Sequence, residues 1–147
     1  MWTSRAISPS PSPWSRALFR ELSSVGVGVD LVDIRRFSNV LARSPRFIDR
    51  VFTHREIAQC GGDRPRASSL AARWAAKEAV AKVLIDNRGL SWHDCELITG
   101  ENGEPRLEIS GTVRAAADEL GIDSWLVSLS HDGHMAIAFV VAGRGIR

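Results

Sequence analysis

The sequence has no tyrosine, two cysteines and no long apolar run. Cys60 and Cys95 form no CxxC motif and lie near no histidine pair with zinc-ligand spacing, so they indicate neither a disulfide framework nor a structural zinc site. The longest apolar run, around Met135–Ala142, is too short for a membrane-spanning helix and suits a buried strand. These features favour a protein of a reducing cytoplasm with no membrane span.

The overall composition is that of a globular domain, and the N-terminal segment differs from the rest of the chain. Of the 147 residues, 44% are hydrophobic and 24% are charged, which is sufficient for one hydrophobic core. Residues 1–24 contain SPSPSP and are rich in Ser, Pro and Arg. We expect a poorly ordered extension there and a single domain over 25–147. A transit peptide and an upstream start codon are the alternatives.

Acidic residues are scarce in one stretch. Residues 35–55 hold a single acid, Asp49, and an apolar stripe at helical spacing that breaks at Ser44-Pro45. The same stretch holds six arginines: Arg35, Arg36, Arg43, Arg46, Arg50 and Arg55. This excess predicts docking of an anionic partner, which is a nucleic acid, an acidic protein or a phosphorylated ligand. The alternative is an ordinary solvated helix face.

The first predicted strand covers residues 25–34, VGVGVDLVDI. Its β-branched residues favour a strand, and Gly26 and Gly28 indicate close approach of another backbone or of a ligand. Asp30 stands in this apolar run, where a carboxylate needs a partner. It either caps the following helix or is paired or bound to a metal.

The longest predicted helix includes Ala71–Leu84, AARWAAKEAVAKVL. It is rich in alanine and has no glycine or proline. Glu78 and Lys82 lie four residues apart and therefore share one helix face, as do Arg73 and Lys77. Judged alone, this pattern also fits a solvated ion pair of little energetic weight.

The rest of the chain predicts a capping box at Thr53-His54-Arg55-Glu56, two β-hairpins and a short helix. The first hairpin turns at Asn102-Gly103, and the second joins residues 125–130 to 135–142 with His131 at its entry. A helix over 112–120 lies between them. The order of these elements predicts an α+β fold with a mainly antiparallel sheet packed on a long central helix.

Four residues from three separate elements suggest phosphate chemistry. Asp30 and Glu78 supply two carboxylates, the usual minimum for holding Mg²⁺. Lys82 and His131 suit a substrate that carries phosphate groups.

Three blocks of the sequence together resemble a known family. GVGVDLVDIRR, ARWAAKEAVAK and SLSHDGHMAIAFVV are similar to the conserved blocks of the holo-acyl-carrier-protein synthases, small 4′-phosphopantetheinyl transferases. The resemblance covers residues 25–142. It implies transfer of 4′-phosphopantetheine from coenzyme A to a serine of an apo acyl carrier protein, or of a carrier domain of a synthase, with release of adenosine 3′,5′-bisphosphate.

The resemblance also implies roles for individual residues. Asp30 and Glu78 would hold the Mg²⁺, and Lys82 would lie beside the phosphates. His131 would contact coenzyme A or orient a water that acts as base. Further coenzyme A contacts would come from Arg73, Lys77 and Ser130.

The family is typically a homotrimer with its sites at subunit boundaries, so His131 would serve a site with Glu78 either of its own chain or of a neighbouring chain. Four arginines would dock the acidic carrier: Arg35, Arg36, Arg43 and Arg46. The sequence departs from the family after the central helix, where LIDNRGLSW replaces a glycine-rich GTG turn. A nucleic-acid-binding module and a non-catalytic scaffold domain are the competing interpretations. The first is disfavoured because Phe37, Phe47 and Phe52 fall on the apolar stripe.

Overall fold

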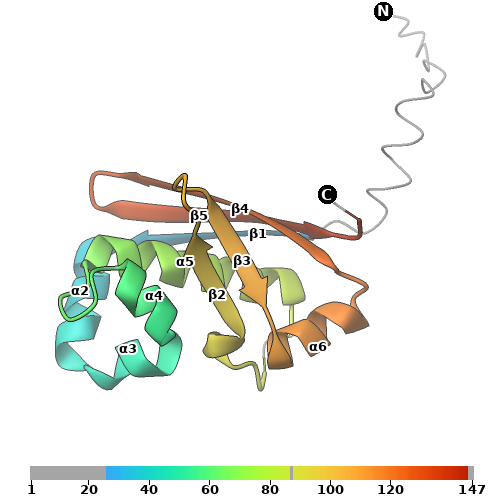
Figure 1. Cartoon of the computed structure of the whole chain (residues 1–147), viewed down its shortest axis with the longest axis horizontal. Coiled ribbons are helices and arrows are strands. Elements are labelled where there is room, and N and C mark those ends of the chain that lie inside the picture. Colours follow the sequence, from blue (N-terminus) through green and yellow to red (C-terminus); the bar gives the residue numbers. More distant parts are fainter. Residues whose placement is uncertain (1–25, 87, 146–147) are drawn as a thin grey trace, which may run out of the picture.

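The computed structural model describes residues 26–86 and 88–145, so the predicted extension over residues 1–24 lies outside the described residues. The fold is α+β, with antiparallel strands packed on one long helix, as the sequence predicted (Figure 1). In chain order the elements are β1 (Gly26–Asp33), α2 (Ile34–Arg43), α3 (Arg46–Val51), α4 (His54–Gln59), α5 (Ala67–Leu84), the 3₁₀ helix η1 (Trp92–Asp94), β2 (Cys95–Thr99), β3 (Pro105–Ile109), α6 (Gly111–Glu119), β4 (Ser124–Asp132) and β5 (Met135–Gly143).

The strands form two antiparallel sheets rather than one. β1, β5 and β4 make a three-stranded sheet in that order, and β2 and β3 make a separate hairpin. Both predicted hairpins are confirmed. Gly103 in the first turn has a φ of 82°, a conformation that glycine adopts at no steric cost.

Helix α5 lies along the inner face of the three-stranded sheet (Figure 1). Ala75, Ala76 and Ala79 are fully buried, and their small side chains let the sheet approach closely. A β-carbon at Gly28 would collide with the backbone carbonyl of Ala79, which explains the glycine in β1. No helix in the described part of the chain has the length and hydropathy needed to cross a membrane.

Helices α2, α3 and α4 gather near one end of α5 (Figure 1). The Asp33 side chain accepts a hydrogen bond of 2.9 Å from the backbone N–H of Arg36 and caps α2. The capping interpretation of Asp30 is therefore wrong. The predicted break at Ser44-Pro45 separates α2 from α3, and the predicted capping box begins α4.

The aromatic side chains of this helical corner belong to the core. Phe37 and Phe52 are almost fully buried, and Phe47 packs edge-to-face on Phe37. None of the three rings is placed as a platform for stacking bases, which agrees with their position on the predicted apolar stripe.

The outer face of the three-stranded sheet is apolar and exposed. Alternate residues of each strand face α5, and the others point away from it. Six large apolar side chains on the outer face are 37–59% exposed: Val27, Val29, Leu31, Leu126, Ile137 and Phe139. This outer face is large for a surface exposed to water.

Candidate active site

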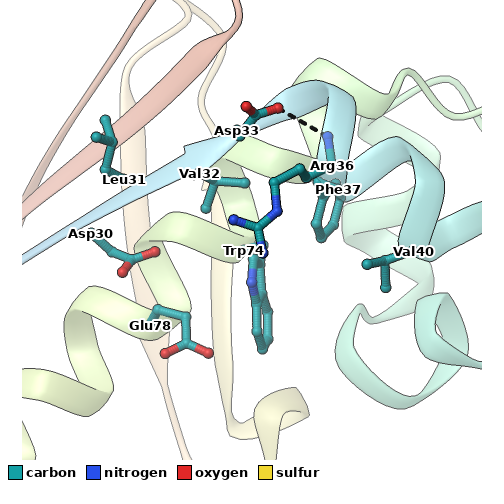
Figure 2. A pocket seen from close by; sticks show the side chains of 9 residues that line it. All are labelled: Asp30, Leu31, Val32, Asp33, Arg36, Phe37, Val40, Trp74 and Glu78. Atoms are coloured by element: carbon teal, nitrogen blue, oxygen red, sulfur yellow. Dashed lines mark hydrogen bonds between the residues drawn. The ribbon is translucent and has the colours of Figure 1, made fainter.

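A cavity of about 320 Å³ lies between β1, α2 and α5 (Figure 2). Asp30 from β1 and Glu78 from α5 direct their carboxylates into it, and Trp74 forms part of its wall. We call it the carboxylate cavity. It is lined by Asp30, Leu31, Val32, Asp33, Arg36, Phe37, Val40, Trp74 and Glu78. Two carboxylates that are distant in the sequence thus meet, with apolar side chains of α2 opposite them.

Lys82 joins this site through Asp30. Its Nζ lies 2.8 Å from Asp30 Oδ1 and donates a second hydrogen bond of 2.8 Å to the carbonyl of Val29. The interpretation of Glu78 and Lys82 as a solvated i,i+4 ion pair is therefore wrong. Among the described residues, Glu78 has no hydrogen-bond or ion-pair partner.

The surroundings of Glu78 disfavour its charged form. Burial raises the pKa of its carboxyl above the usual value, the Asp30 carboxylate raises it further, and the Lys82 ammonium lowers it in part. By contrast, the hydrogen bond from the Arg36 backbone lowers the pKa of Asp33 at the rim of the cavity. The cavity therefore contains one carboxyl group that lacks a full counter-charge.

The donor set of the cavity fits Mg²⁺. Within residues 26–86 and 88–145, no group of three or more His, Cys, Asp or Glu side chains is arranged to hold a metal. A pair of carboxylates suits Mg²⁺, which is often bound through one or two of them and takes waters and phosphate oxygens as its other ligands. A cation between Asp30 and Glu78 would also relieve the repulsion that raises the pKa of Glu78.

The structure does not bring His131 and Ser130 to the carboxylate cavity of the same chain. Both are exposed near the end of β4, and neither lines that cavity. His131 pairs with Ala136 of β5, which in turn pairs with Val32 of β1, so one strand separates it from the strand of Asp30.

Arg73 and Lys77, for which coenzyme A contacts were predicted, do not line the carboxylate cavity. Both side chains are buried on other faces of α5. Arg73 donates hydrogen bonds to Gln59 Oε1 and Thr99 Oγ1, and Lys77 forms an ion pair of 2.9 Å with Glu56. Within one chain these internal partners engage Arg73 Nη2 and Lys77 Nζ, and contact of either residue with coenzyme A stays a prediction. Their shared helix face, correctly predicted, is a buried face.

Three of the clustered arginines line a second hollow, of about 540 Å³, at the junction of α2 and α3. We call it the arginine hollow. It is lined by Val40, Arg43, Ser44, Pro45, Arg46, Phe47 and Arg50. Val40 lines the carboxylate cavity as well, so the two depressions are neighbours.

The other three arginines of the cluster differ in location and in partner. Arg36 lines the carboxylate cavity, Arg35 is exposed on α2, and Arg55 forms an ion pair of 2.7 Å with Glu108. Arg50 belongs to the arginine cluster that the sequence analysis identified, but it was not among the four residues predicted to contact the carrier. Its spacing of four residues from Arg46 on α3 was the signal that both share one face.

Comparisons with known proteins agree with this architecture. The family model of the 4′-phosphopantetheinyl transferase superfamily matches residues 26–139, which include the carboxylate cavity and the arginine hollow. The fold is thus that of the 4′-phosphopantetheinyl transferase superfamily.

The most similar curated relatives include two named holo-acyl-carrier-protein synthase. The protein of Salinispora arenicola is 53% identical over 120 residues, covering 82% of this chain and 98% of the relative. The protein of Streptomyces avermitilis is 51% identical over 121 residues, with the same two coverages. The chain therefore belongs to the holo-acyl-carrier-protein synthases of this superfamily, as its sequence blocks indicated.

Solved structures give the same result. The complex of ACPS with CoA from Chronobacterium ammoniagenes has a TM-score of 0.72 and 31% identity, covering 82% of this chain and 97% of that one. The holo-acyl-carrier-protein synthase of Helicobacter pylori in complex with coenzyme A has a TM-score of 0.69 and 31% identity, with coverages of 80% and 99%.

Proposed function

We propose that this enzyme transfers 4′-phosphopantetheine from coenzyme A to a serine of an apo acyl carrier protein, depends on Mg²⁺ and releases adenosine 3′,5′-bisphosphate. The observation that carries the proposal is the meeting of Asp30 and Glu78 in one cavity beside Lys82. The serine Oγ forms a bond to the β-phosphorus of coenzyme A, the bond from that phosphorus to the bisphosphate breaks, and the serine proton passes to water.

In this proposal Asp30 and Glu78 hold the Mg²⁺. The bound ion would polarise the pyrophosphate oxygens and offset their negative charge. Lys82 has its ammonium at the same place, 2.8 Å from Asp30 and half exposed, where it is accessible to a phosphate. It stabilises the negative charge that develops on the departing bisphosphate.

A transfer assay with and without Mg²⁺ tests the function. Wild-type enzyme, coenzyme A and an apo carrier protein should give phosphopantetheinylated carrier, detected as a mass increase, only when Mg²⁺ is present. Glu78→Gln should abolish transfer while its circular dichroism spectrum stays that of the wild type. Full activity of Glu78→Gln, or activity of the wild type in EDTA, would refute the metal assignment.

The apolar outer face supports a homotrimer. Two of the strands that form this face also carry residues of the predicted active site. Asp30 lies in β1, and Ser130 and His131 lie in β4. Burial of this outer face against other copies would remove apolar side chains from water. We infer from the family resemblance that the same assembly brings His131 of one subunit near Glu78 of its neighbour. His131 and Ser130 would then contact coenzyme A in that shared site.

Mixed trimers distinguish a shared site from a site within one chain. Glu78→Gln and His131→Ala homotrimers should both be inactive. Subunits of the two variants, exchanged at equal concentration, should regain roughly a quarter of the sites, since each site of a closed ring takes one residue from each neighbour. No recovery after verified exchange would show that His131 acts within its own chain, and a monomer by light scattering would refute the trimer.

The arginine hollow is the proposed docking place of an acidic carrier protein. Arg36, Arg43 and Arg46 present positive charge along the two adjoining depressions, with Arg35 beside them. Such attraction mainly raises the association rate and is weakened by salt.

Charge reversal in the arginine hollow tests this docking. Arg43→Glu should raise KM for the carrier protein with little change in kcat. Arg106→Glu, the same charge reversal at an exposed position of β3, is the matched control and should change neither. An equal rise of KM in both variants would show that net charge matters and that this surface does not.

A further inference from the structure

A second ion pair of α5 lies outside the carboxylate cavity. Lys77 Nζ is 2.9 Å from Glu56 Oε2, and both side chains are completely buried. We call this the closed pair. Lys77 directly precedes Glu78, and consecutive residues of a helix point about 100° apart. The closed pair therefore holds α5 from one side while Glu78 points into the cavity on another.

Further hydrogen bonds anchor both members of the closed pair. Glu56 accepts hydrogen bonds from the backbone N–H groups of Leu97, at 2.9 Å, and Thr53, at 3.0 Å. Lys77 donates to the carbonyls of Trp92, at 2.7 Å, and Cys95, at 2.5 Å. Four elements, α4, α5, η1 and β2, thus meet at two side chains.

These contacts continue to the carboxylate cavity. Trp92 accepts the hydrogen bond of Lys77 through its backbone carbonyl. The ring of the same residue packs edge-to-face on the Trp74 ring, and the two ring centroids are 4.9 Å apart. Trp74 lines the cavity one helical turn before Glu78. The Lys77 ammonium also lies 5.7 Å from the centre of the Phe52 ring. A rotation of α5 that moved Glu78 would break several of these contacts.

We propose that Lys77 and Glu56 are positioning residues, which fix the rotation of α5 so that Glu78 faces Asp30. This rests on the proposed function of Glu78. Stability alone does not explain the closed pair, because apolar side chains of similar volume often replace a buried ion pair without loss of stability. Ion pairs and hydrogen bonds add a directional constraint that apolar packing lacks, and a metal ligand needs such a constraint.

The test compares the double variant Lys77→Met/Glu56→Gln with Val113→Ala. The double variant removes both charges together, so no buried charge is left alone. Val113 is buried in α6, and its truncation lowers stability without touching the closed pair or the cavity. Mn²⁺ binding, followed by electron paramagnetic resonance, and the steady-state constants of transfer are measured well below each melting temperature.

We expect the double variant to lose roughly 10- to 100-fold in cation affinity and in kcat, the range seen when groups that orient metal ligands are changed. Its KM for the carrier protein should stay that of the wild type, and Val113→Ala should keep wild-type cation affinity and kcat.

If the double variant does not fold, Glu56→Asp, which keeps both charges but draws the carboxylate back from Lys77, should show a smaller loss of the same kind. Wild-type cation affinity and kcat in the folded variant would overturn the proposal. Failure of the wild type itself to bind Mn²⁺ would instead refute the metal assignment, and the comparison of kcat would still decide the role of the closed pair.

Discussion

Helix α5 carries two lysine–carboxylate ion pairs of nearly equal length in opposite surroundings. The closed pair, Lys77 with Glu56, has an N–O distance of 2.9 Å and no exposed side-chain surface. Lys82 and Asp30, which we call the open pair, are separated by 2.8 Å, and their side chains are 53% and 16% exposed. One pair is enclosed by α4, β2 and η1, whereas the other borders a cavity.

The two pairs have the same residue chemistry and nearly the same N–O distance, so the difference in burial is what separates a structural ion pair from one that is accessible to a ligand. In the closed pair, internal donors and acceptors surround both charges, so the pair resists exchange and holds elements together. In the open pair, water reaches the ammonium, which lets a substrate phosphate or a cation replace one partner.

The largest expected effect is the loss of stability in Lys77→Met. This change leaves the Glu56 carboxylate buried without its counter-charge, and the free energy of unfolding should fall by about 3–5 kcal/mol. Urea unfolding followed by circular dichroism measures it. Lys77→Met/Glu56→Gln should recover part of the loss, and equal instability of the single and double variants would contradict the role assigned to the unpaired charge.

The next effect is the exposure of Cys95, whose carbonyl binds Lys77. Burial raises the pKa of its thiol to about 12, so almost no thiolate forms near neutral pH until the structure opens. In a Cys60→Ala background, Lys77→Met should accelerate labelling of Cys95 by a disulfide reagent by roughly two to three and a half orders of magnitude, since about 1.4 kcal/mol corresponds to tenfold in the opening equilibrium. Lys82→Met should leave the labelling rate nearly unchanged; similar acceleration by both variants would remove the distinction between the two pairs.

A smaller effect is expected for the open pair itself. Lys82→Met should change the free energy of unfolding by less than about 1 kcal/mol, because the ammonium is largely hydrated. Its kcat should nevertheless fall sharply if Lys82 stabilises the departing bisphosphate. Urea unfolding and the transfer assay on the same preparation separate the two quantities. A large loss of stability with kcat unchanged would reverse the roles assigned to the two lysines.

The sequence predicted local structure better than the partners of charged residues. The hairpin turn at Asn102-Gly103, the break at Ser44-Pro45 and the capping box at Thr53 follow from interactions within a few residues. The meeting of Asp30 and Glu78 was also predicted, because the family resemblance related a strand and a helix that are distant in the chain.

Helical spacing alone could not identify the partner of each lysine. It correctly placed Lys77 and Arg73 on one face of α5, but it does not say which element covers that face. Glu56 was interpreted only as part of a capping box, yet its carboxylate also binds Lys77 through tertiary packing. Lys82 likewise has the right spacing for Glu78 but reaches Asp30 of β1, which lies beside α5 only in the folded chain.

The smallest effect is the pH dependence contributed by Glu78 in the absence of metal. Its pKa in the folded chain is raised above the ordinary value of 4.5, so the folded chain holds more protons than the unfolded chain between those two pKa values. The stability that this group contributes is therefore fully present below pH 4.5 and is lost as the pH rises through the raised pKa. Glu78→Gln stays uncharged and should lack this decline, so the variant should gain stability relative to wild type across that window.

Urea unfolding in EDTA on both sides of the window measures the difference, and saturating Mg²⁺ should then stabilise the wild type alone. Parallel pH profiles of the two proteins in EDTA would show that the Glu78 carboxyl is adequately solvated or paired, and the contrast between an open and a closed side of α5 would then rest on the lysines alone.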